Sequence, residues 1–136
     1  MFDSRGPLEA LVGLLNGLGI DGQAGVPQGG PKLFGYVALA GQSIRQLALR
    51  TKERKSTYYV GLAYRVEGAE SDAELALADA LDLLLAALLA DSSLSGTSDR
   101  AIEIDLTAAG QPEYRDFAKV EYRTYPVLVT VIQHDS

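Results

Sequence analysis

The sequence contains no cysteine and only one histidine. Without cysteine the chain has no disulfide bond, no thiolate metal site and no cysteine nucleophile. The single histidine, His134, lacks the second histidine or cysteine that a zinc site requires, and no Ser-His-Asp pattern includes it. We therefore expect His134 to be a solvated side chain.

Long hydrophobic runs are also missing. The longest run is LLLAALLA, residues 83–90, far short of the roughly 20 apolar residues that cross a bilayer. Near the start of the sequence, Asp3 and Glu9 interrupt the apolar residues, and no basic segment precedes a clean apolar run, so we expect no signal peptide. These features predict a cytoplasmic chain with no membrane partner.

The composition that remains is that of a globular protein. The chain has 136 residues, of which 47% are hydrophobic and 22% are charged. A chain of this length buries roughly two-thirds of its unfolded surface when it folds. We therefore expect one domain, residues 1–136.

Two segments have the periodicity of helices. Apolar residues recur at helical spacing over residues 7–18, and a longer helix is expected over residues 71–90. The phrase SDAE, with Ser71 as N-cap and Glu74 three residues later, is a capping box. The second helix is apolar nearly all round, so its outer flank either packs within the chain or forms a subunit interface.

The strand patterns complete an α+β order. Alternating or apolar runs predict strands at residues 33–40, 56–66, 100–108 and 119–132, whereas residues 42–49 form either a strand or an irregular arm. The glycine-rich segment 19–32 and residues 109–117 are expected to be loops. A change of apolar phase at Tyr125 and Pro126 predicts a bulge or bend. We predict an antiparallel or mixed β-sheet, with the long Ala/Leu-rich helix and the N-terminal helix packed on one side.

No motif in the sequence carries recognisable chemistry. Two carboxylate pairs, Glu103 with Asp105 and Asp79 with Asp82, lie where a solvated face carries charge. Each pair supplies too few ligands for a metal ion. No nucleotide-binding, metalloprotease or hydrolase signature is present. We expect no catalytic residues, no metal and no cofactor, and therefore no enzyme.

A basic cluster stands out in a chain of formal net charge −6. It holds five of the twelve Lys and Arg residues: Arg45, Arg50, Lys52, Arg54 and Lys55. An acidic body repels the phosphate backbone, so we do not expect independent or sequence-specific DNA binding. The cluster is either a solvated hairpin tip, a contact with the acidic face of a neighbouring copy, or the lining of a ring lumen, where several copies multiply a weak contact with DNA.

The order of these parts resembles a known family. The basic segment TKERK is followed by the strand STYYVGLAYRVEG, the helix SDAELALADALDLLLAALLADSSLSG, the strand RAIEIDL and the long strand AKVEYRTYPVLVTVI. This order and texture over residues 33–132 resembles the tail-terminator proteins of long-tailed phages and related gene transfer agents. The glycine-rich segment 19–32 matches no part of that pattern.

The resemblance implies a structural role in the virion. Copies would form a homo-hexameric ring on the last ring of tail-tube protein, stop tube polymerisation and present a surface to the head-completion or neck protein. DNA would pass through the lumen, and the protein would sit at the head-proximal end of the tail after assembly in the host cytoplasm. The basic cluster of one copy would meet acidic residues of the next: Glu67, Glu70, Asp72 or Glu74.

Three other functions stay open on the sequence. One is a different neck component, such as a head-closure or tail-completion protein. The second is a small-ligand enzyme or binding domain of α+β type, which would require a pocket with converging polar groups, and the sequence identifies no such set. The third is a small α+β binding module that dimerises through its Ala/Leu-rich helix.

Overall fold

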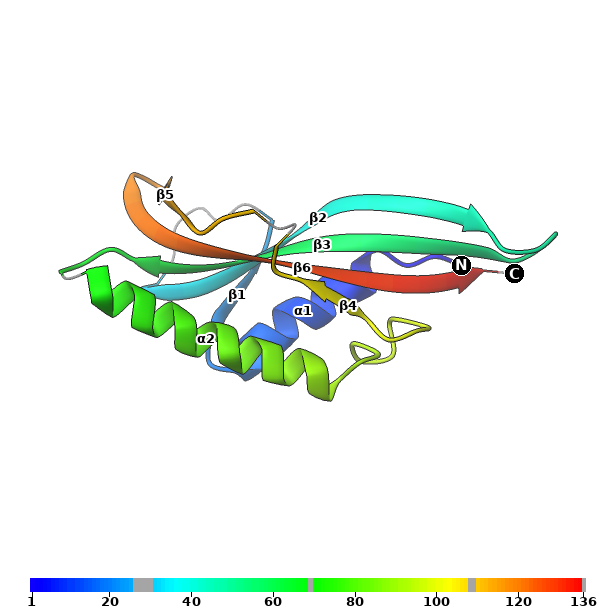
Figure 1. Ribbon diagram of the computed structural model, residues 1–136, viewed down its shortest axis with the longest axis horizontal. Coiled ribbons are helices and arrows are strands. Elements are labelled where there is room, and N and C mark those ends of the chain that lie inside the picture. The colour runs from blue at the N-terminus through cyan, green and yellow to red at the C-terminus, as the bar shows by residue number, and fades with distance from the viewer. Residues whose placement is uncertain (26–30, 69, 108–109, 136) are drawn as a thin grey trace.

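The computed structural model describes residues 1–25, 31–68, 70–107 and 110–135, and it has the predicted α+β architecture (Figure 1). One mixed six-stranded sheet carries two helices. The elements in chain order are α1 (Arg5–Gly17), β1 (Asp21–Ala24), β2 (Leu33–Gln46), β3 (Lys52–Arg65), α2 (Glu70–Ala90), β4 (Glu103–Asp105), β5 (Glu113–Phe117) and β6 (Val120–Asp135).

The sheet is built around β6. Its strand order is β1-β2-β3-β6-β4, and β5 also pairs with β6. Only β1 and β2 are parallel, while every other pairing is antiparallel. β6 pairs with β3 on one side and with β4 and β5 on the other, so it lies inside the sheet and not at its edge.

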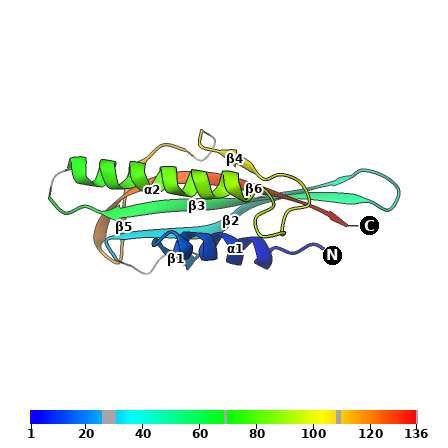
Figure 2. The ribbon, with the colours of Figure 1, turned by 90° about the horizontal axis from the view of Figure 1, so that it is seen from below.

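Both helices cover the same face of the sheet, as predicted (Figures 1 and 2). Their buried leucines meet the inward side chains of three strands and form the main core. Its members include Leu11, Leu15, Leu77, Leu84, Leu88, Val37, Tyr58, Val60, Leu62, Val127, Val129 and Val131. Because side chains alternate between the two faces along β3, the neighbouring Tyr58 and Tyr59 point to opposite sides of the sheet. Tyr58 belongs to this core, and Tyr59 packs on the opposite face.

A second, aromatic cluster lies on that opposite face. It consists of Phe34, Tyr36, Ala63, Phe117 and Tyr122. This aromatic cluster explains why the apolar positions of β6 change phase near Tyr125 and Pro126. Tyr122 packs in the aromatic cluster, and Val127 packs in the main core on the other face. The predicted bulge at Tyr125 and Pro126 is absent from the β3–β6 pairing, because its register runs without a shift from Arg65 opposite Tyr122 to Lys52 opposite Asp135. The apolar phase changes because the covered face changes along β6.

The glycine-rich segment is not loop throughout, contrary to the prediction. Asp21–Ala24 form β1, parallel to β2. A Cβ at Gly22 would lie 2.7 Å from the Val12 carbonyl oxygen, so glycine here allows close packing of β1 on α1. Gly19, with φ +80°, follows the C-cap residue Leu18 and ends α1. Residues 26–30 lie outside the described residues.

Two further strand predictions need correction. Residues 113–117 were expected to be loop but form β5, a polar strand joined to β6 through Ala118 and Lys119, both at positive φ. Such a two-residue turn normally carries Asn or Gly, and neither residue is present at positions 118 and 119 to mark the turn. Of the strand predicted at residues 100–108, the described part forms a strand only at Glu103–Asp105, and residue 108 lies outside the described residues.

The long helix begins one residue earlier than predicted. Because α2 starts at Glu70, Ser71 lies inside the first turn and is not the N-cap residue. Glu74 therefore does not complete the expected capping box with Ser71. The Glu74 carboxylate accepts hydrogen bonds from Arg123 Nε, at 2.7 Å, and from the Tyr125 hydroxyl. Glu74 therefore fastens α2 to β6.

Residues 42–49, left open between strand and arm, mostly continue β2. β2 pairs with β3 as far as Gln46 opposite Lys52, with one irregularity between Leu39 and Gly41. The chain turns over residues 47–51. The distal hairpin, defined here as residues 41–57, extends past the ends of both helices (Figure 1).

Candidate functional site

The five predicted basic residues all lie in the distal hairpin, but they do not form one patch. Arg45 is on β2, Arg50 is in the turn, and three are on β3: Lys52, Arg54 and Lys55. Strand alternation sends neighbouring β3 side chains to opposite faces of the sheet. A run that reads as continuous positive charge in the sequence is therefore divided between two faces and a tip.

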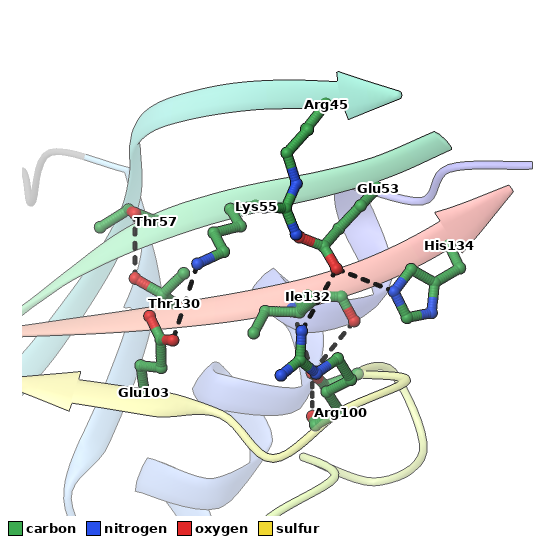
Figure 3. Close-up of polar contacts among 10 residues, drawn as sticks. Arg45, Glu53, Lys55, Thr57, Arg100, Glu103, Thr130, Ile132 and His134 are labelled. Atoms are coloured by element: carbon green, nitrogen blue, oxygen red, sulfur yellow. Dashed lines mark hydrogen bonds and ion pairs between the residues drawn. The ribbon is translucent and has the colours of Figure 1, made fainter. Parts of the chain in front are cut away.

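Glu53 organises the face of the sheet that the helices leave uncovered (Figure 3). Its side chain is only 2% exposed and stands directly opposite Arg45 on β2 and His134 on β6. Arg45 Nη2 lies 3.2 Å from Oε1, while Arg100 Nη1 and His134 Nε2 lie 3.4 and 3.0 Å from Oε2. The hydrogen bond with His134, and then the two arginines, lower the pKa of Glu53 despite its burial.

This cluster corrects the expectation that His134 is solvated. Its side chain is one-third exposed and contacts Glu53, and its backbone N–H donates to Asp99 Oδ2 at 2.7 Å. Glu53 and Arg100 were not predicted as site residues, because Glu53 stands among cations in TKERK and Arg100 is far along the chain. The register of the hairpin, with position 45 opposite 53, is the signal that would have found the first pair.

The next rows along the same face are also polar. Lys55 Nζ lies 3.8 Å from Glu103 Oε1 on β4, and the hydroxyls of Thr57 and Thr130 lie 3.0 Å apart. Lys55 also borders a hollow of about 230 Å³ together with Ser43, Arg45 and Glu53. Two carboxylates, Glu53 and Glu103, face three cations in these ion pairs, Arg45, Arg100 and Lys55, so the group of charges around the hollow is net positive.

Arg54 points to the opposite, helix-covered face. It is 9% exposed, donates from Nη2 to Gln133 Oε1 at 3.1 Å, and places its guanidinium carbon 4.8 Å from the centre of the Phe2 ring. Gln133 Nε2 in turn donates to the Asp3 carbonyl oxygen. Arg54 therefore holds the N-terminal segment against the sheet, and its side chain is not on the surface.

Only two of the five basic side chains remain exposed without an ion pair among the described residues, Arg50 and Lys52. They stand at and beside the turn, next to Leu49, which is 95% exposed. Leu47 and Ile44 are 45% and 64% exposed on the same hairpin. The exposed tip is thus both cationic and apolar, a combination that suits a protein contact better than a nucleic-acid contact.

The four acidic residues proposed as partners are dispersed. Glu67 forms an ion pair with Arg65, whose Nε lies 2.6 Å from Glu67 Oε1 without hydrogen-bond geometry. Glu74 is engaged by β6, and hydrogen bonds from Tyr125 and Arg123 lower the pKa of its carboxyl. Asp72 is exposed. Glu70 begins α2, and its side chain lies outside what the structure describes.

The two long edges of the distal sheet differ. The edge of β6 is covered by the segment after α2, because Ser98 Oγ accepts from Ile132 N at 3.0 Å and Asp99 N donates to the Ile132 carbonyl oxygen at 2.7 Å. β1 pairs with β2 only at residues 34–37, so the outer edge of β2 from Ala38 to Gln46 has no partner strand in the described part of the chain. Such an edge is open to another chain.

The outer flank of α2 is the other exposed apolar surface. Leu77, Leu84 and Leu88 are fully buried against the sheet, whereas Leu75, Leu83 and Leu89 are 67%, 50% and 74% exposed. The described part of the chain therefore leaves the outer flank of α2 uncovered, and a subunit interface on that flank stays a prediction.

Within the described ranges, no cluster of three or more acidic, histidine or cysteine side chains is arranged to hold a metal ion. Among those same residues, no helix combines the length and apolar character needed to cross a membrane. No family model matches the chain, and no curated protein matches it significantly in sequence.

Proposed function

We propose that the protein is a structural virion protein, a tail terminator whose copies form a ring on the end of the tail tube. The observation that carries the proposal is the distal hairpin. It extends beyond the helices (Figure 1) and ends in the exposed tip Leu49, Arg50 and Lys52 on a chain of net charge −6. A lone acidic domain gains nothing evident from such a tip, whereas a ring uses it at every subunit contact.

A closed ring requires two different surfaces that complement each other at every step. The hairpin tip supplies a cationic and apolar surface. Exposed acids on α2, such as Asp72, Asp79 and Asp82, supply negative charge elsewhere on the molecule. Opposed charges on separate surfaces favour head-to-tail contacts over the contact of two identical patches.

In this proposal six copies cap the last ring of tail-tube protein and stop its polymerisation. The opposite side of the ring receives the head-completion or neck protein, and DNA crosses the lumen without sequence-specific contacts. The protein is then located at the head-proximal end of the virion tail. The role needs no catalytic residue, metal or cofactor.

Native mass spectrometry of the purified protein, alone and with its candidate tail-tube protein, tests the proposal. We expect a six-fold assembly, either alone or on the tube, and an end to tube growth when the protein is added to polymerising tube subunits. A stable monomer that leaves tube length unchanged would sink the proposal. Binding only to the head-side protein, with no effect on the tube, would favour a head-closure or tail-completion role.

A second candidate is an oligomeric binding module, favoured by the exposed leucines on α2. In this alternative, Leu75, Leu83 and Leu89 of two copies meet in a dimer. A dimer that Leu89→Asp dissociates, and that ignores the tube protein, would establish this alternative against the ring.

A further inference from the structure

The hollow on the helix-free face of the distal hairpin is lined by side chains from two paired strands. Ser43 and Arg45 belong to β2, and Glu53 and Lys55 belong to β3. Ser43 stands opposite Lys55 and Arg45 stands opposite Glu53, so the side chains form two adjacent rows on one face of the sheet. The register thus brings an ammonium, a guanidinium and a hydroxyl to the border of one hollow.

These three donors have unused hydrogen-bonding capacity. The Lys55 ammonium lies 3.8 Å from Glu103 Oε1 (Figure 3), an ion pair that is longer than the roughly 2.7–3.2 Å of an N–H···O hydrogen bond. The Ser43 hydroxyl has no hydrogen-bond partner among the residues that the structure describes. Arg45 donates to Glu53 from Nη2, and a guanidinium has five N–H groups. A ligand with several acceptor oxygens can therefore be bound without breaking the existing contacts.

The charge around the hollow favours an anion. Glu53 also lines it, but Arg45 contacts Oε1 of this carboxylate, and Arg100 and His134 contact Oε2, so its charge is balanced. Over the whole distal hairpin, residues 41–57, five basic residues stand against one acidic residue. The hairpin therefore has a formal net charge of +4 in a chain of −6, and such a local concentration of charge attracts anions.

The donor set fits a phosphate group better than a carboxylate. A carboxylate has two oxygens, which the fork of a single arginine satisfies, whereas a phosphate monoester presents three strong acceptor oxygens. Arginine, lysine and serine side chains are among the usual partners of phosphate oxygens. One water molecule occupies about 30 Å³ of liquid, so a hollow of about 230 Å³ has room for a phosphate group and part of its hydration shell.

We propose that this hollow binds a phosphate group, held by the Lys55 ammonium, the Arg45 guanidinium and the Ser43 hydroxyl. The site goes beyond the proposed function, because one chain supplies all three donors and binding does not require a ring. The side chains of Arg45 and Lys55 are 67% and 43% exposed, so the group can belong to a free phosphate anion or to a nucleic-acid backbone.

Isothermal titration calorimetry with sodium phosphate, at fixed ionic strength, tests the proposal. We expect one phosphate per chain, with a several-fold higher Kd in Lys55→Gln and in Ser43→Ala. Arg50→Gln is the matched control for Lys55→Gln, since it removes one positive charge from the same hairpin at a residue that does not line the hollow. It should keep the wild-type affinity, and circular dichroism verifies that every variant is folded.

The remaining outcomes decide against the site or identify the source of the phosphate group. Equal weakening by Lys55→Gln and Arg50→Gln would mean that only the field of the hairpin attracts phosphate, and it would overturn the site. Sodium acetate that binds as tightly as phosphate would overturn the assignment to phosphate. A short DNA duplex is titrated in parallel: duplex binding that Lys55→Gln weakens supports a backbone phosphate, and binding of inorganic phosphate alone supports a free anion. Binding of neither would refute the proposal.

Discussion

At the residue scale, Glu53 is the charge on which the distal sheet depends. It is buried, and Arg45, Arg100 and His134 all contact it. Because its pKa is lowered in the folded state, its stabilising contribution is complete above the unfolded value of about 4.3 and is lost as pH falls through the lowered folded pKa. We expect Glu53→Gln to lower the thermal midpoint at pH 7 and to flatten the acid side of the stability profile.

Thermal unfolding followed by circular dichroism from pH 3 to pH 8 measures this effect. Glu121→Gln is the matched control, since Glu121 is an exposed carboxylate on β6 with no ion pair in the described structure. Equal loss of stability at pH 3 and pH 7 in Glu53→Gln would contradict the assigned role of its charge.

Gly61 is a second residue whose identity is fixed by its neighbours. A Cβ at this position would overlap the buried ring of Tyr36 in the aromatic cluster. We expect Gly61→Ala to destabilise the fold by roughly 1–3 kcal/mol, as other overpacked sites do. Urea unfolding measures the change, and Gly41→Ala, which has open space around its Cβ, should cost much less. Equal effects at the two glycines would refute this account of Gly61.

At the scale of the element, α2 divides into a buried and an exposed face. Leu84 is fully buried and Leu89 is 74% exposed. We expect Leu84→Ala to lower the free energy of unfolding by about 2–5 kcal/mol, and Leu89→Ala to change it by less than about 0.5 kcal/mol. Chemical denaturation of dilute protein measures both. A large loss in Leu89→Ala that grows with protein concentration would instead show that this flank is covered in an oligomer.

Elements with strong local periodicity could be predicted, and those defined by their partners could not. The two helices and β3 follow directly from their apolar spacing. β1 and β5 could not be predicted, because one is glycine-rich and the other polar, and each is a strand only because it hydrogen-bonds to β2 or β6. The five basic residues all lie in the distal hairpin, but their division into buried Arg54, paired Arg45 and exposed Arg50 could be seen only from the strand register.

At the scale of the whole molecule, the protein is a sheet with a cationic tip and acids elsewhere. Arg45 and Lys55 are exposed but form ion pairs with Glu53 and Glu103, and Arg54 is buried, so Arg50 and Lys52 are the exposed cations of this cluster without an ion pair among the described residues. Charge reversal at Arg54 would disturb the fold itself. Tests of assembly therefore belong at the tip.

Arg50→Glu is the sharpest of these tests. It changes the formal net charge from −6 to −8, since one positive charge becomes one negative charge, and it places like charges together at each proposed contact. Exposed ion pairs are worth roughly 0.2–1 kcal/mol, but a ring repeats the loss at every interface, so we expect assembly to require several-fold more protein. Because salt screens exposed charges, the difference from wild type should shrink at high ionic strength.

Lys119→Glu makes the same change of net charge at an exposed lysine in the β5–β6 turn, away from the tip. Native mass spectrometry across a concentration series, at low and high salt, compares the three proteins. Weaker assembly of Arg50→Glu than of Lys119→Glu would locate the interface at the hairpin tip. Equal weakening of both would mean that total charge governs assembly, and the specific role of the tip would have to be abandoned.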